Sequence, residues 1–362
     1  MGILVFVIVI VALIIVHEFG HFVVAKWAGM RVDEFGLGYP PRAYMIGGVG
    51  ETAITLNWLP FGGFVKIYGE DGPERGPRAF GARPRILQAL VLVAGVAMNL
   101  LFAYVLIVGA LFVGTPRALS PEELPKATNT QLAVSNVLTS SPAARAGIEP
   151  GDSILSARDA SGAWQSSDPQ SFTTFVAASG GTPIELTVKH NESVTMITAT
   201  PATGVAAGDL ARYALGVEVA TIGVVPLSLP RAIVEGAQLT WSATTLTAVG
   251  LAHFFYAILT LHADLSQVSG PIGIAGVVGG ASAQGLGDLL SIMAIISINL
   301  ALINLIPIPA LDGGRLLFVI IEGIIRRPIK VSVARAVNAA SFVFLILLML
   351  VVTAHDIYRI VG

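Results

Sequence analysis

The fold is decided by residues 3–26, ILVFVIVIVALIIVHEFGHFVVAK, where a long apolar run leads directly into polar residues and then becomes apolar again. On a helix, His17 and His21 lie one turn apart on the same face, so both imidazoles can converge on one metal ion. Glu18 lies beside them, within reach of a water bound to that metal. The alternative is a pair of histidines satisfied by core hydrogen bonds, but ionisable residues inside a membrane helix are costly and need a partner or a function. The pattern therefore predicts zinc binding.

The composition is typical of an integral membrane protein. Of the 362 residues 54% are hydrophobic and 12% are charged, whereas a soluble protein has about 25% charged residues. The net charge of -2 does not indicate nucleic-acid binding, and the absence of cysteine excludes disulfides, thiolate zinc ligands and a cysteine nucleophile. Zinc must then be held by histidines and carboxylates. The first segment lacks a basic n-region and a small-residue cleavage site, so we interpret it as a retained span and not as a signal peptide.

Four segments are long and apolar enough to cross a bilayer, which takes roughly 20 residues. They are residues 3–25, 86–113, 289–309 and 336–353. Lys and Arg indicate their direction, because the 26–85 loop holds eight and the 310–335 loop five, against seven over the long 114–288 stretch. Short basic loops stay in the cytoplasm. We therefore expect an α-helical polytopic protein whose long segment and both termini lie outside the cytoplasm.

Residues 51–69 predict a β-hairpin between the first two spans. Apolar residues alternate along 52–58, residues 60–63 (PFGG) supply a turn, and residues 64–68 form the second strand. Non-helical backbone at membrane depth is tolerated only where protein or a watery cavity satisfies its polar groups. A membrane-associated hairpin beside the histidines is the favoured interpretation, and an ordinary cytosolic hairpin is the alternative.

Residues 116–203 have a soluble composition, with Ser, Thr, Pro and Gly between short β-branched runs. This pattern predicts a small, mostly β domain. The phrase SPAARAGIEPGD at 141–152 resembles the motif of bacterial PDZ domains, which bind extended peptide ends by strand addition. The similarity weakens after Ile154, where residues 156–164 depart from the usual strand and turn. Ligand binding by this domain is therefore less well founded than its fold.

Residues 204–285 are interpreted as a linker followed by an amphipathic helix on the membrane surface. The segment 239–261 is apolar enough to be a fifth span, but a fifth crossing would place the second basic loop on the outer side, against the charge bias. We expect a helix along the outer surface and then a flexible stretch at 269–274 (SGPIGI). His253 and His262 are then interfacial residues and not metal ligands.

The end of the third predicted span offers a third metal ligand. In residues 304–314, NLIPIPALDGG, two prolines interrupt the helix and Asp312 arrives near the membrane. A carboxylate completes two histidines and a water in the open four-coordinate site of zinc catalysis. Asp312 could instead cap a helix that starts near Gly313. Glu322 is a rival carboxylate, but it lies a few turns into the next helix, where an interfacial position is favoured.

Together these residues resemble the site-2 protease family of intramembrane zinc metalloproteases, in particular its RseP-like bacterial members, which act in regulated intramembrane proteolysis. The resemblance covers nearly the whole chain. It rests on HEFGH at 17–21, PFGGFVK at 60–66, the PDZ-like phrase, GPIGI at 270–274 and NLIPIPALDGG at 304–314. The outer region departs from that of RseP, which has two tandem PDZ domains, because residues 116–203 have room for only one.

The resemblance implies a set of site residues. His17, His21 and Asp312 would hold zinc, which lowers the pKa of its bound water to about 7. Glu18 would be the general base and acid, and Asn304 would help to place the substrate.

Substrate binding is expected at the hairpin. A helical substrate must unwind before attack, because its carbonyls are tied up in the helix. An exposed edge of the hairpin, with Gly62, Gly63 and Phe64, can then hold the extended peptide by strand addition.

The expected substrates are single-span membrane proteins, such as anti-sigma factors or signal-peptide remnants, already cut by another protease. The expected location is the lipid bilayer of a bacterial inner membrane, with no nucleic-acid partner. The domains are residues 1–115 with the HEFGH motif, the PDZ domain at 116–203, the linker and surface helix at 204–285, and the last two spans at 286–362. Two alternatives remain at this stage: a membrane zinc peptidase of another family, for which Asp312 is dispensable, and a non-catalytic PDZ adaptor.

Overall fold

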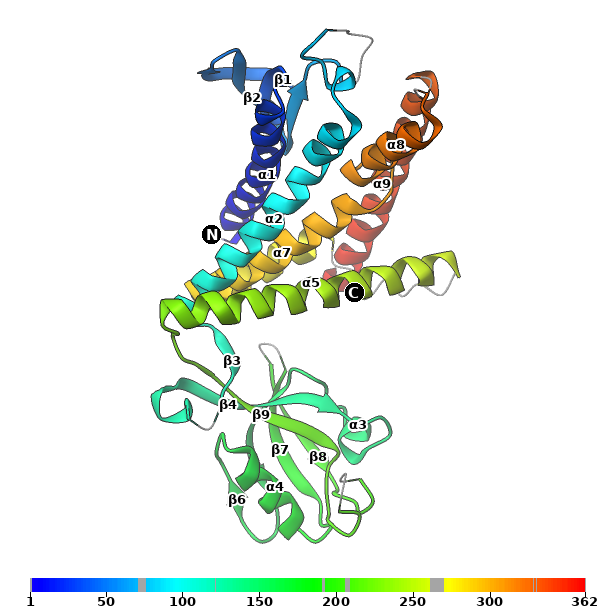
Figure 1. Cartoon of the computed structure of the whole chain (residues 1–362). Helices are drawn as coiled ribbons and strands as arrows, with labels where there is room; N and C mark the ends of the chain where they lie inside the picture. Colours follow the sequence, from blue (N-terminus) through cyan, green and yellow to red (C-terminus); the bar gives the residue numbers. More distant parts are fainter. Residues whose placement is uncertain are drawn as a thin grey trace. The chain divides into compact units, whose positions relative to one another are not determined.

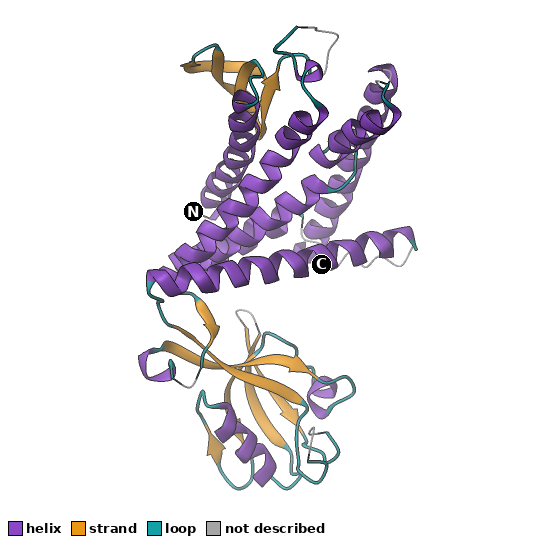
Figure 2. Cartoon of the chain, in the orientation of Figure 1, coloured by secondary structure: helices purple, strands orange, loops and turns teal. Residues whose placement is uncertain are grey.

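The computed structural model describes residues 2–70, 76–120, 122–190, 193–205, 209–260, 270–327, 329 and 331–361. It divides into two compact units. The helical unit consists of Met1–Phe112 and Ser228–Gly362, and the β unit consists of Val113–Leu227. Figures 1 and 2 show that helices make up most of the first unit and strands most of the second.

In the described part of the chain four helices are long and apolar enough to span a membrane, and they correspond to the four predicted spans. They are α1 (Gly2–Trp27), α2 (Arg85–Val113), α7 (Leu286–Leu305) and α9 (Val331–Val361). The third predicted span was too long, since α7 ends at Leu305 and not at residue 309. Pro307 and Pro309 have no backbone N–H to donate and cannot continue the helix.

The described part of the helical unit contains three further α-helices: α5 (Leu229–Leu259), α6 (Pro271–Gln284) and α8 (Asp312–Ile325). Helix α5, which contains His253, is not among the four candidate spans, and it crosses α2 and α7 in Figure 1. Its position at a membrane surface stays a prediction. His262 lies outside the described residues.

The stretch predicted to be flexible at 269–274 is instead, from Pro271 onward, the first turn of α6. Proline at the first helical position after glycine favours a helix start. The Asp356 carboxylate of α9 accepts hydrogen bonds from the backbone N–H groups of Gly270 (3.1 Å) and Gly273 (2.9 Å). A carboxylate at this end of a helix satisfies free donors and complements the helix dipole. The sequence reading missed α6 because this cap comes from a residue far along the chain.

Strands β1 (Val32–Val49) and β2 (Thr52–Ile67) form a two-stranded antiparallel sheet. The chain reverses at Gly50 and Glu51, which was not predicted, and again at the predicted turn, residues 60–63. Residues 53–56 run parallel to 34–37, whereas residues 63–66 run antiparallel to them. Residues 34–37 of β1 pair with 63–66 on one side and with 53–56 on the other. The long strands therefore fold over each other, which alternation of apolar residues alone does not reveal.

The β unit contains a seven-stranded sheet in the order β3-β9-β4-β5-β7-β8, with β6 beside β5. The strands are β3 (Pro116–Ala118), β4 (Thr128–Val137), β5 (Ser153–Arg158), β6 (Ala163–Trp164), β7 (Ile184–His190), β8 (Ser193–Ala199) and β9 (Val217–Val224). Two helices accompany them, α3 (Pro142–Ala146) and α4 (Pro169–Ala178). The predicted boundary at residue 203 cuts off β9, yet β9 pairs with both β3 and β4, so the unit continues to Leu227.

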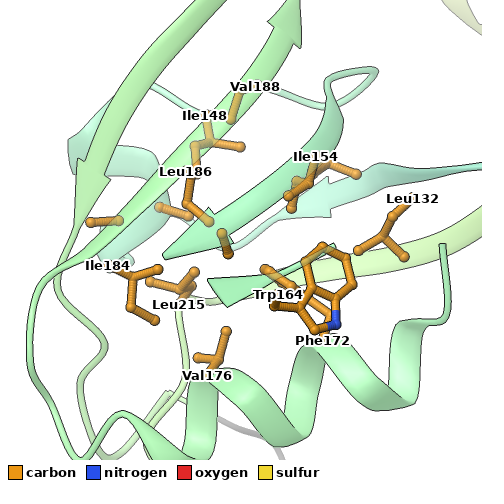
Figure 3. Packing of buried hydrophobic residues seen from close by; sticks show 14 residues of the cluster. Leu132, Ile148, Ile154, Trp164, Phe172, Val176, Ile184, Leu186, Val188 and Leu215 are labelled. Carbon is orange, nitrogen blue, oxygen red and sulfur yellow. The ribbon is translucent and has the colours of Figure 1, made fainter. Parts of the chain in front are cut away.

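The core of the β unit is made by inward-facing residues of the sheet and by one face of α4. Ile154 of β5 and Leu186 of β7 are at most 1% exposed. The rings of Trp164 and Phe172 pack with centroids 5.0 Å apart (Figure 3). Burying side chains of this size is worth about 1.5–3 kcal/mol each, which makes them the main support of the sheet.

The PDZ-like phrase forms α3 and the loop after it. The Ser141 hydroxyl accepts a hydrogen bond from the Ala144 N–H at 3.1 Å and so caps α3. Ile148 is buried in the core of the β unit. The Asp152 carboxylate is buried and accepts from the Glu149 N–H at 3.0 Å, which closes the loop before β5.

Candidate active site

The three predicted metal ligands meet in the helical unit. The Nε2 atoms of His17 and His21 are 3.2 Å apart, and they lie 3.0 and 3.1 Å from Oδ2 of Asp312. Both histidines are 7% exposed. These are the donor types of a catalytic zinc site, and in a tetrahedral site with bonds of about 2.0–2.1 Å the ligand atoms lie about 3.3 Å apart. The cluster therefore fits a zinc ion in both chemistry and size.

Asp312 reaches the histidines because the chain turns tightly before α8. A Cβ on Gly313 would lie 2.3 Å from the Leu305 carbonyl oxygen, so only glycine allows this approach. Asp312 is the first residue of α8, and no side chain caps that helix. Burial raises the pKa of the Asp312 carboxyl, but hydrogen bonds with His17 and His21 outweigh it and lower the pKa.

Helix α2 holds both imidazoles from the other side. Nδ1 of His21 lies 2.7 Å from the Val91 carbonyl oxygen, and Nδ1 of His17 lies 3.2 Å from the Asn99 amide. Between them Gly95 faces the rings, and a Cβ there would lie 2.4 Å from Nε2 of His21. The sequence reading missed this support. The available signal was a lone Asn in an apolar span, four residues after a glycine.

The other predicted site residues line the same cavity, which has a volume of about 910 Å³. They are Glu18, Asn304, Gly62, Gly63 and Phe64. Glu18 is half-buried and makes no hydrogen bond with any described residue. Nδ2 of Asn304 lies 3.5 Å from Nε2 of His17, so this amide is at the edge of the metal cluster.

Tyr39 and Arg315 are among the cavity residues that were not predicted from the sequence. Tyr39 of β1 stacks on Phe64 with ring centroids 6.5 Å apart, and burial raises the pKa of its hydroxyl, which keeps this group protonated. Arg315 of α8 forms an ion pair with Glu70 at 2.7 Å. Both lie in stretches that read as ordinary strand and helix.

Glu322, the rival carboxylate, lies away from the metal cluster. It forms an ion pair with Arg85 at 2.7 Å and accepts a hydrogen bond from the Ile329 N–H. It is not one of the three residues whose ligand atoms lie within 4.8 Å of one another.

Comparison with known proteins agrees with this geometry. The sequence model of Peptidase family M50 matches residues 5–348. A protein named as a zinc metalloprotease in Clostridium perfringens is 35% identical over 347 residues, which cover 96% of this chain and 95% of that protein. Another so named in Nostoc is 33% identical, covering 96% and 93%. A protein of Enterococcus faecalis named as the protease eep is 26% identical over 443 residues, covering 99% of both chains.

Proposed function

Because this chain belongs to Peptidase family M50, the site-2 protease family, and is a zinc metalloprotease of the membrane, we propose that its zinc is held by His17, His21 and Asp312. The observation that carries the proposal is the convergence of their ligand atoms to 3.0–3.2 Å, two from successive turns of α1 and one from the start of α8. Two buried imidazoles and a carboxylate leave the fourth position of a tetrahedral site to water.

Glu18 is proposed as the general base and acid. Bound zinc supplies a Lewis acid and a water with a pKa near 7. Glu18 would accept a proton from the attacking water and donate it to the leaving amine, which requires a carboxylate that lies in the cavity and makes no hydrogen bond elsewhere. Its side chain meets this requirement among the described residues.

Substrate is proposed to bind along β2 as an added strand. Residues 63–66 pair with β1 on one side, and Gly62, Gly63 and Phe64 line the cavity. An extended peptide on this edge gains backbone hydrogen bonds that replace those lost when its helix unwinds. The substrates in this proposal are single-span proteins of a bacterial inner membrane, already trimmed by another protease, and the edge of β2 lies at membrane depth.

The test compares Glu18→Gln with Asp312→Ala in the full-length protein. Glu18→Gln should keep stoichiometric zinc and lose cleavage of a single-span substrate by about 100-fold or more, because it removes only the proton carrier. Asp312→Ala should lose both zinc and cleavage. The control Glu322→Ala should keep both. Zinc loss in Glu18→Gln, or full zinc binding in Asp312→Ala, would contradict the assignment.

The β unit is proposed to be a PDZ domain on the outer side, where it excludes substrates that still carry bulky outer domains. Its ends allow a clean test, because Pro116 pairs directly with Val224 and a short Gly/Ser bridge can replace the residues between them. If the β unit acts as a filter, the deletion variant should cut untrimmed substrate. If the β unit instead binds the new C-terminus of a trimmed substrate, the deletion variant should cut trimmed substrate more slowly.

A further inference from the structure

The two site histidines use their ring nitrogens in the same way. Each directs Nε2 toward Asp312 and Nδ1 toward α2. For His21 the Nδ1 partner is the Val91 carbonyl oxygen, which only accepts hydrogen bonds. His21 must therefore carry its proton on Nδ1, and the Nε2 lone pair is left free for a metal.

His17 needs the same tautomer, and its partner is a side chain. If Nε2 of His17 binds the metal, Nδ1 carries the proton and must face an acceptor. The Asn99 amide is the group at that position, with Nδ2 at 3.2 Å, while its buried Oδ1 has no hydrogen-bond partner among the described residues. Turning the amide by 180° brings Oδ1 onto the Nδ1–H, since the amide oxygen and nitrogen occupy equivalent positions.

We propose that Asn99 is a positioning residue for His17, whose Nδ1–H donates to the amide oxygen and whose Nε2 is thereby fixed on the metal. This inference rests on the proposed zinc site. Asn99 is suited to the task because it is 0% exposed and because Ser297 of α7 holds its backbone. The Ser297 hydroxyl donates a hydrogen bond to the backbone carbonyl oxygen of Asn99 at 2.8 Å. Helices α2 and α7 thus jointly define the orientation of a ligand on α1.

The competing explanation is that Asn99 serves only helix packing. Two substitutions of similar size distinguish this explanation from the proposed positioning role. Asn99→Leu fills the space but removes the acceptor, whereas Asn99→Asp keeps an acceptor for Nδ1–H. Asn299→Leu on α7 is the matched control, because the Asn299 amide donates to the Ile295 carbonyl within its own helix. All variants are made in the full-length protein.

The main readout is the zinc dissociation constant, measured by competition with a chelator. Asn99→Leu should weaken zinc binding about 10- to 100-fold, with Asn99→Asp and Asn299→Leu close to wild type. Unchanged affinity in Asn99→Leu overturns the proposal, as does equal weakening in Asn99→Leu and Asn99→Asp. If wild type and His17→Ala bind zinc equally well, the zinc site itself is wrong, which is a separate failure.

A second readout applies if Asn99→Leu does not fold. In the zinc-loaded protein with ¹⁵N-labelled histidine, His17 should show a proton on Nδ1, and its NMR signal should move to lower field in Asn99→Asp because a carboxylate is a stronger acceptor. A proton on Nε2, or an unmoved signal, overturns the proposal.

Discussion

The two units bury polar side chains for different purposes. In the β unit, Ser141, Asp152 and Ser179 each make a hydrogen bond to a backbone group three residues away, although Asp152 also contacts His190, 38 residues away, and Thr221 donates to the Ser167 carbonyl, 54 residues away. In the helical unit several buried polar side chains connect segments that are much farther apart in the sequence. They include His17 with Asp312, 295 residues apart, Ser297 with Asn99, 198 apart, and Asp356 with Gly270, 86 apart.

The difference follows from what surrounds each unit. The β unit gathers its apolar side chains into one core (Figure 3), because burial from water is the main driving force for its folding. The spanning helices expose apolar residues over most of their length, and lipid gives little apolar preference for one helix over another. Polar contacts and close packing therefore specify how these helices fit together. Each such contact is a place where the comparison can be tested.

The largest effect is expected at Gly95, where α2 touches the histidines. Gly95→Ala would put a Cβ 2.4 Å from Nε2 of His21, so the ring must leave its position. We expect loss of zinc and of proteolysis by about 100-fold or more. Gly109→Ala in the same helix is the control, since its Cβ would meet only Leu290 at 3.4 Å. Wild-type zinc content in Gly95→Ala would show that α2 does not define the site.

In the β unit the largest effect should come from an apolar residue. Leu186 is 0% exposed, and Leu186→Ala should lower the free energy of unfolding of this unit by about 2–5 kcal/mol because it leaves a cavity. Amide hydrogen exchange of β5 and β7 in the full-length protein measures the loss. The control Met196→Ala, at a side chain 73% exposed, should change little. A similar loss in both variants would mean that the core is not where the packing energy lies.

A smaller effect is expected from the cap of α6. Asp356→Ala leaves the N–H groups of Gly270 and Gly273 without their carboxylate partner, at a cost of about 1–3 kcal/mol for a buried donor. Faster exchange of these amides measures it. Thr353→Ala, one turn earlier on α9, removes only a bond to the Met349 carbonyl of the same helix and is the control. Exchange that is unchanged in Asp356→Ala would contradict the role of this contact.

The same contrast explains how much could be predicted from the sequence. The four spans and the cluster of His17, His21 and Asp312 follow from local apolarity and from the chemistry of a zinc site, which needs a third ligand. Asn99 and α6 were missed because their roles depend on partners in other helices. Likewise β9 was missed because strand pairing with β4 is not encoded in its own composition, and the reversal at Gly50 and Glu51 was missed because it depends on how residues 44–49 pair with 52–56.

The smallest effect concerns an ion pair at the surface of the β unit. Nδ1 of His190 lies 2.6 Å from Oδ1 of Asp152, and this hydrogen bond, with the carboxylate charge, raises the pKa of His190 above its ordinary value of 6.5. A raised pKa in the folded state stabilises the fold fully below about pH 6.5, and the contribution disappears as the pH rises through the folded-state pKa. His190→Gln should therefore reduce protection from amide exchange in β7 at about pH 5.5 and have little effect at about pH 9.

Lys189→Gln provides the matched control, because it removes one positive charge from the neighbouring, exposed position of the same strand. Its effect should be small and the same at both pH values. Exchange rates must first be corrected for their intrinsic dependence on pH. Equal destabilisation by His190→Gln at both pH values would show that His190 contributes packing and not charge.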